Sequence, residues 1–259
     1  MSGLILSGLI LLAFFAGSLL LLHFLVPGLT PADFFAPDRP YVYLVQILVL
    51  LAFCLIAGIL LHISFRKTSS AEIFFFFLFL FLTSLEGTRL LILAVHLREL
   101  PFENAAALSR LVYFCRYLGT LCLFTSGLFA SGLQYQRMEA VLGICALVAF
   151  SLAVTLPLDT GGDLHELLFR NSLERQFSIG FLVIQLFAVG NYFYAGWLNN
   201  NRNYHVMALG MALVLTGREL LFRQTRGETG PLLALTGLIL LFLGTAVFGK
   251  RTHEVYLWF

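Results

Sequence analysis

The sequence predicts an all-α bundle of membrane-crossing helices without a soluble domain, and three observations support this. Of the 259 residues, 59% are hydrophobic and 12% are charged, whereas soluble domains carry about 25% charged residues. The apolar residues occur in runs that reach the roughly 20 residues a helix needs to cross a bilayer. No segment shows the short apolar–polar alternation of a membrane β-strand, so helices are left to satisfy the backbone inside the bilayer.

Eight apolar segments are expected to cross the membrane, and residues 1–259 form one integral membrane domain. The seventh segment is short and could combine with residues 223–230 in a re-entrant arrangement, which leaves seven spans as the alternative. In chain order, the predicted spans are residues 3–26, 41–65, 72–95, 108–130, 140–158, 177–198, 204–222 and 231–249.

Lysine and arginine in the short loops set the expected orientation, because these residues are retained on the cytoplasmic side. The two sides carry equal numbers of bases only when Arg170 and Arg175 of the long loop 159–176 are counted. We therefore expect both termini in the cytoplasm and the protein in a bacterial inner membrane. The bases of the predicted cytoplasmic side are Arg66, Lys67, Arg137, Arg202, Lys250 and Arg251.

The long loop 159–176 carries leucine and phenylalanine at helix-like spacing beside charged residues. This pattern is typical of an amphipathic helix that lies on the outer surface of the membrane. An ordered loop helix without a function of its own is the alternative.

Neither a cofactor nor a metal is predicted. The formal net charge of +2 gives no reason to expect a nucleic-acid partner. The four cysteines lie in apolar segments and form no C-x-x-C pair, so they are interpreted as small buried apolar residues. His62 and His205 have similar expected depths and could ligate a haem, although interfacial histidines that reach water are the commoner case. No hydrolase or nucleotide-binding motif is present.

Ionisable residues inside the predicted spans are the main functional signal, since each costs a few kcal/mol to place in hydrocarbon and therefore faces the bundle interior. The third span contains Glu86 and Arg89, the fourth Arg116, and the seventh Arg218 and Glu219. All five fall in the half of the membrane nearer the predicted outer side. We expect them to form one cluster.

Spacing along the helices supports this cluster. Glu86 and Arg89 are three residues apart and share a helix face. In the fourth span, Tyr113, Arg116, Tyr117 and Thr120 form one polar stripe. Arg110 and Arg223 are expected to reach the headgroups instead. The predicted ligand-binding residues are Glu86, Arg89, Tyr113, Arg116, Tyr117, Arg218 and Glu219.

Two hypotheses follow for this cluster. In the first, Arg116 and Arg218 contact an anionic small molecule or lipid headgroup, because the guanidinium fork matches carboxylate and phosphate. Glu86 and Glu219 then hold the arginines, and the protein is a small transporter or a sensor-like receptor module. In the second, the ion pairs are structural, and the protein is a subunit of a larger membrane complex whose partners are other membrane subunits. An enzyme acting on lipid, with Glu86 or Glu219 as the general base, lacks any accompanying nucleophile or metal set. Membrane lipid is a partner in every case.

Overall fold

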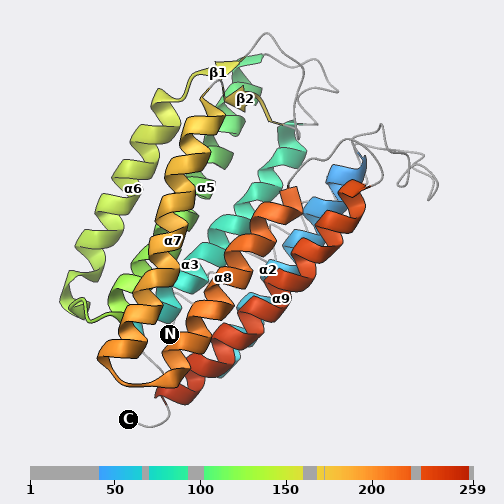
Figure 1. The fold of residues 1–259 in the computed structure, drawn as a ribbon. Helices are drawn as coiled ribbons and strands as arrows, with labels where there is room; N and C mark the ends of the chain where they lie inside the picture. The colour runs from blue at the N-terminus through green and yellow to red at the C-terminus, as the bar shows by residue number, and fades with distance from the viewer. Residues whose placement is uncertain are drawn as a thin grey trace.

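The computed structural model describes residues 41–65, 70–92, 102–159, 168–171, 173–222 and 229–256. These residues form a bundle of seven α-helices, which confirms the all-helical prediction (Figure 1). Six of the helices are long and apolar enough to cross a membrane, which is compatible with an integral membrane protein. The helices are α2 (Tyr41–Ser64), α3 (Ala71–Ser84), α5 (Phe102–Ala130), α6 (Met138–Thr155), α7 (Glu174–Leu198), α8 (Arg202–Phe222) and α9 (Thr229–Tyr256).

The predicted spans agree with these helices in number and order from residue 41 onward. The predicted span 3–26 lies outside the described residues, as does most of the connection 223–230. Helix α8, the predicted seventh span, is a continuous helix of 21 residues, but it is not among the six that meet the length and composition criteria for crossing a membrane. Helix α9 continues seven residues beyond the predicted end at 249. Its last turns are polar, and Arg251 there pairs with Glu254 one turn later.

The third span differs most from its prediction. The α-helix α3 ends at Ser84, a single 3₁₀ turn η2 follows at Leu85–Thr88, and helical residues continue to Ile92. The hydroxyls of Ser84 and Thr88 donate to the carbonyls of Phe81 and Leu85. Hydroxyls that bond back to the preceding turn bend helices, which accounts for the change in winding here. Glu86 therefore lies in a tightened turn rather than in a regular α-helix.

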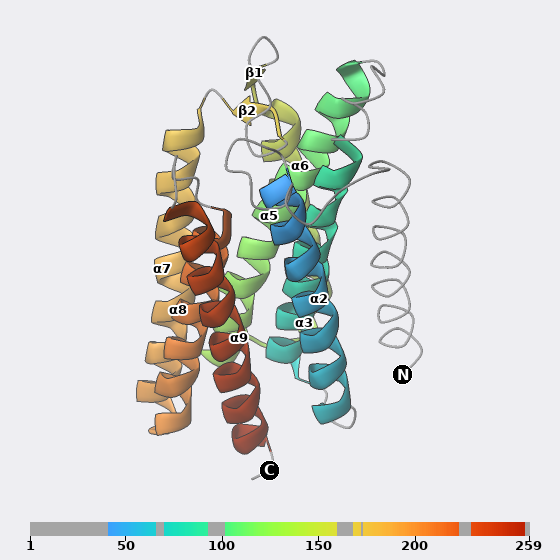
Figure 2. The same cartoon turned by 90° about the vertical axis from the view of Figure 1, so that its right-hand side faces the viewer.

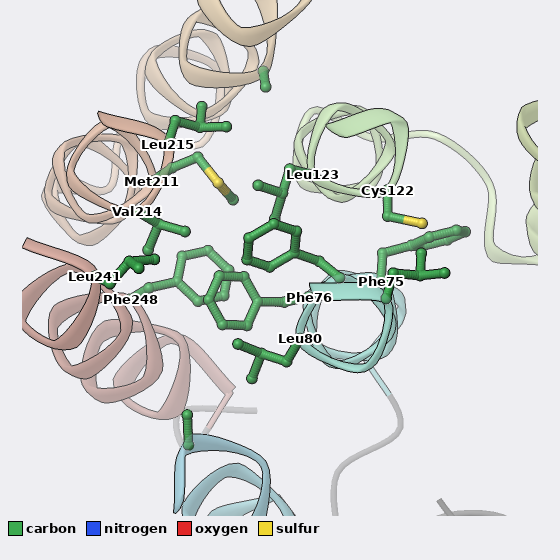
Figure 3. Packing of buried hydrophobic residues seen from close by; sticks show 14 of the residues in the cluster. Phe75, Phe76, Leu80, Cys122, Leu123, Met211, Val214, Leu215, Leu241 and Phe248 are labelled. Carbon is green, nitrogen blue, oxygen red and sulfur yellow. The ribbon is translucent and has the colours of Figure 1, made fainter. Parts of the chain in front are cut away.

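Helix α3 is surrounded by other helices, and most of its side chains are buried. Aromatic residues on it form the centre of the core, which Figure 3 shows between α3, α5, α8 and α9. The rings of Phe76 and Phe248 stack with centroids 4.4 Å apart. Helices α6 and α7 instead expose large apolar side chains such as Leu147 and Leu186, as expected for surfaces that face lipid.

Helices α8 and α9 lie side by side along their length (Figure 1 and Figure 2). Two pairs of glycines bring their backbones together: a Cβ added at Gly217 would lie 2.6 Å from the Gly237 carbonyl oxygen, and one at Gly244 would lie 2.7 Å from that of Gly210. The reversed order of the pairs shows that the helices are antiparallel. Small residues permit such close approach between membrane helices.

The segments predicted to face the cytoplasm lie together at one end of the bundle. The α5–α6 and α7–α8 connections lie at the same end as the C-terminal end of α9 (Figure 1). Arg251 of α9 donates to Asn203 of α8, and the His253 ring contacts Phe65 at the end of α2. The α7–α8 turn places Asn200 at a φ of 47°, a left-handed conformation that asparagine tolerates.

The predicted amphipathic helix in the loop 159–176 is wrong for residues 168–171, whereas residues 160–167 lie outside the described part of the chain. Residues Leu158–Asp159 (β1) pair antiparallel with Arg170–Asn171 (β2). Leu168 and Phe169 are buried against Ile92 and Val112. The apolar residues of this segment thus pack onto the helix ends, and a two-residue ladder holds them there.

Candidate functional site

Glu86 is the centre of a charged cluster inside the bundle, and its side chain is completely buried. In a 3₁₀ turn, side chains three residues apart stand directly above one another. Arg89 accordingly lies beside Glu86, and its Nη2 donates to Glu86 Oε2 at 2.9 Å. The pair expected from the sequence spacing is confirmed.

Arg218 of α8 binds the other oxygen of the same carboxylate. Its Nη2 donates to Glu86 Oε1 at 2.7 Å, and its Nη1 donates to the Thr120 hydroxyl of α5 at 3.2 Å. The Thr120 hydroxyl donates its single hydrogen to the Arg116 carbonyl, so its oxygen can accept the hydrogen bond from Arg218. The guanidinium also lies 5.7 Å from the centre of the Phe79 ring, within the range of a cation–π contact. Arg218 therefore ties α8 to both α3 and α5.

Arg116 completes the cluster from α5. Its Nη2 lies 3.9 Å from Glu86 Oε2, an ion-pair distance that exceeds hydrogen-bond length. Its side chain is 27% exposed, whereas those of Arg89 and Arg218 are 1% and 3% exposed. Arg89 and Arg116 have further interactions beyond this carboxylate. Arg116 is thus the arginine that both faces Glu86 and reaches the surface.

The geometry explains how buried charges are tolerated here. Each oxygen of the Glu86 carboxylate accepts one hydrogen bond from a charged donor, which is stronger than a neutral hydrogen bond. A buried carboxylate without such partners would be strongly destabilising. The cluster therefore fixes three segments far apart in sequence, namely η2, the middle of α5 and the end of α8.

The two predicted tyrosines lie on α5 near Arg116 and have structural contacts of their own. The Tyr113 hydroxyl donates to the Phe169 carbonyl at 3.2 Å, which connects α5 to the β1–β2 segment. The Tyr117 ring stacks on Phe181 of α7 with centroids 4.4 Å apart. Arg110 of α5 is exposed, in line with its expected position at the surface.

The assignment of Glu219 to the cluster is wrong. Its side chain is exposed, and Glu219 Oε1 accepts a hydrogen bond from Gln185 Nε2 of α7 at 3.1 Å. Consecutive residues point about 100° apart around an α-helix, so Glu219 is turned away when Arg218 faces the interior. Arg223, which is expected to reach the headgroups, lies outside the described residues. Sequence reasoning missed the ring contact of Phe79, because one phenylalanine in an apolar run carries no distinguishing signal.

Within the described ranges, no group of three or more histidine, cysteine, aspartate or glutamate side chains could hold a metal ion. His62 and His205 each keep a buried Nδ1 without a hydrogen-bond partner. His205 packs closely over Gly196, where an added Cβ would lie 2.7 Å from the imidazole ring. No contact described for His62 or His205 supports the haem alternative.

Comparison with known proteins gives one similarity and no family. No protein-family model matches the chain, and no solved structure matches it. An uncharacterized protein of Treponema pallidum (strain Nichols) is 25% identical over 243 residues, an alignment that covers 75% of this chain and 69% of the relative. The chain is thus similar to this bacterial protein over most of its length.

Proposed function

We propose that the protein is a multi-pass protein of a bacterial inner membrane that binds an anionic group at Arg116, as a small transporter or a sensor-like receptor module. The anionic group is a carboxylate or phosphate, carried by a small molecule or a lipid headgroup. The observation that carries the proposal is the exposure of Arg116: it belongs to a buried charged cluster, yet about a quarter of its side chain is accessible.

The chemistry of the cluster supports an anion rather than a cation or a neutral ligand. The side chains of Arg89, Arg116 and Arg218 bring three guanidinium groups to one carboxylate, that of Glu86, and Arg89 and Arg116 have further interactions as well. Both Glu86 oxygens already accept short hydrogen bonds from the two buried arginines. A guanidinium offers five N–H donors in a planar fork that matches carboxylate and phosphate oxygens. Glu86 then serves to hold the arginines in place.

The position of the cluster supports access from the side opposite the basic loops. Arg218 lies four residues before the end of α8 at Phe222, and Arg251 lies in the last turns of α9 at the other end of the bundle. By the positive-inside rule, the end with Arg137, Arg202, Lys250 and Arg251 belongs in the cytoplasm. Both termini are then cytoplasmic, and the anion reaches Arg116 from the outer side.

Binding measurements on the purified chain test the proposal. The probes are inorganic phosphate, acetate and a short-chain phosphatidylglycerol, each titrated by calorimetry in detergent. Arg116→Gln should weaken binding of the preferred probe at least tenfold, and Arg116→Lys should give an intermediate loss because it keeps the charge but not the fork. Arg110→Gln is the matched control, since Arg110 lies on the same helix but is exposed outside the cluster.

Two results would count against an anion site. The wild-type chain could bind none of the three probes, or Arg116→Gln could bind as tightly as wild type while its helical content and stability stay unchanged. Either outcome would leave the ion pairs with a structural role alone. The three probes also distinguish the two possible sources of the anionic group. Binding of phosphatidylglycerol but not of phosphate indicates a lipid headgroup, and the reverse indicates a soluble anion.

A further inference from the structure

A second buried carboxyl group lies at the opposite end of the same helical segment. Glu72 is in the first turn of α3 and is 3% exposed. It precedes Glu86 by fourteen residues, which is about 21 Å along a helix. It therefore lies near the end of the bundle that carries the basic loops, far from the arginine cluster.

Hydroxyl groups from four other helices gather around Glu72. The Ser126 hydroxyl of α5 donates to the Glu72 carbonyl at 3.0 Å. Because that hydroxyl has no second hydrogen, the Tyr192 hydroxyl of α7 must donate to Ser126 Oγ, 2.5 Å away. Tyr256 of α9 directs its hydroxyl toward the Glu72 carboxyl, and Tyr204 of α8 lies within electrostatic range.

The surroundings of Glu72 contrast with those of Glu86. Three arginines face Glu86, but among the described residues no ion pair joins Glu72 to a base. Glu72 Oε2 is buried and has no hydrogen-bond partner, and the same is true of the neighbouring Ser70 hydroxyl. The titratable groups that face Glu72 are Tyr192, Tyr204 and Tyr256, and tyrosine hydroxyls are neutral at pH 7. Arg251 of α9, a base near this end of the bundle, pairs with Glu254 instead.

Burial decides which form of such a carboxyl group is stable. An ionised carboxylate removed from water without a charged partner is strongly disfavoured, whereas the neutral acid is comparable to any buried polar group. The N-terminus of α3 favours a negative charge, but the interaction of a helix end with one charge is smaller than the loss of its hydration. The neutral acid also carries an O–H that can donate to a hydroxyl oxygen, and Ser70 and Tyr256 offer such oxygens.

We propose that Glu72 is a proton-binding site: its carboxyl group holds a proton at neutral pH inside the hydroxyl cluster of Ser70, Ser126, Tyr192 and Tyr256. The proton exchanges through the end of the bundle that carries the basic loops. This site is separate from the anion site, and the proposal does not depend on the proposed function.

Infrared spectroscopy of the full-length protein in detergent tests the proposal, because a protonated carboxylic acid has a C=O stretching band that an ionised carboxylate lacks. At pH 7 the wild type should show this band, and exchange into heavy water should shift it. Glu72→Gln should remove the band. Glu139→Gln, which changes an exposed glutamate at the start of α6, should leave it in place.

A second variant and a salt comparison cover the remaining outcomes. Tyr256→Phe removes a hydroxyl that faces the carboxyl group, so it should shift the band while the fold is kept. The spectra are recorded in sodium chloride and in choline chloride at constant pH. The proposal is overturned if the wild-type band is missing at pH 7, or if the band survives in Glu72→Gln and does not shift in Tyr256→Phe. It is also overturned if the band vanishes when sodium is added, and that result would indicate a metal-cation site instead.

Discussion

Glu86→Gln is the substitution for which the structure gives the sharpest expectation. Glutamine has nearly the same shape, but it replaces one carboxylate oxygen with an NH₂ group and removes the charge. Arg89 and Arg218 donate to different oxygens of Glu86, so the amide oxygen keeps one of these hydrogen bonds and the NH₂ group faces the other donor. Two guanidinium groups that are 1% and 3% exposed lose their counter-ion. Removing one partner of a buried ion pair costs about 3–5 kcal/mol.

This loss is a large part of a typical stability of about 5–15 kcal/mol, so it is measurable by reversible unfolding in mixed micelles followed by circular dichroism. Glu219→Gln is the matched control because the same chemical change occurs at an exposed carboxylate on α8. Its effect should stay within about 0.5 kcal/mol of wild type. Equal stabilities for the two variants, or a larger loss in Glu219→Gln, would refute the assignment of Glu86 as the shared anchor.

Three further predictions concern other parts of the bundle. Gly217→Ala should unfold more easily than Gly190→Ala by about 1–3 kcal/mol, since the new Cβ meets α9 backbone at 2.6 Å in the first variant and open space in the second. Raising the pH from about 5 to 7 should lower the free energy of unfolding of the wild type relative to that of Glu72→Gln, by up to about 1.4 kcal/mol per pH unit. Ser126→Ala should cost about 1–3 kcal/mol, because it leaves the buried Tyr192 hydroxyl without its acceptor. Each is measured by the same unfolding titration.

The sign of the pH effect follows from proton counting. The folded form keeps a proton on Glu72, whereas the unfolded chain releases it above about pH 4.3. The folded form therefore binds more protons, and stability falls as the pH rises. An equal pH dependence in the wild type and in Glu72→Gln would contradict the neutral form of Glu72, because every other titrating group is common to the two proteins. In the comparison of Gly217→Ala with Gly190→Ala, any gain in helix propensity is common to both variants and cancels. Equal stabilities would therefore show that α9 does not lie within 2.6 Å of a Cβ added at Gly217.

The candidate site was predictable where it depends on spacing within one helix. The Glu86–Arg89 pair follows from a separation of three residues, and the equal depths of Arg116 and Arg218 follow from counting residues along their spans. The sharing of one carboxylate by three arginines was not predictable, because it requires knowing how α3, α5 and α8 are rotated about their axes. Glu219 shows the consequence: depth placed it in the cluster, but rotation turns it outward to Gln185.

The sequence by itself determined that the chain folds as apolar helices and where most of them begin and end, since the length of an apolar run and the need to satisfy the backbone act locally. Only the tertiary structure decided which face of each helix is buried, because helices that are apolar all round give no periodic signal. It also decided the close contact of α8 and α9 through paired glycines, the extended pairing of residues 170–171, and the burial of Glu72 Oε2 without a hydrogen-bond partner. Each of these depends on contacts between segments distant in sequence, which local pattern cannot specify.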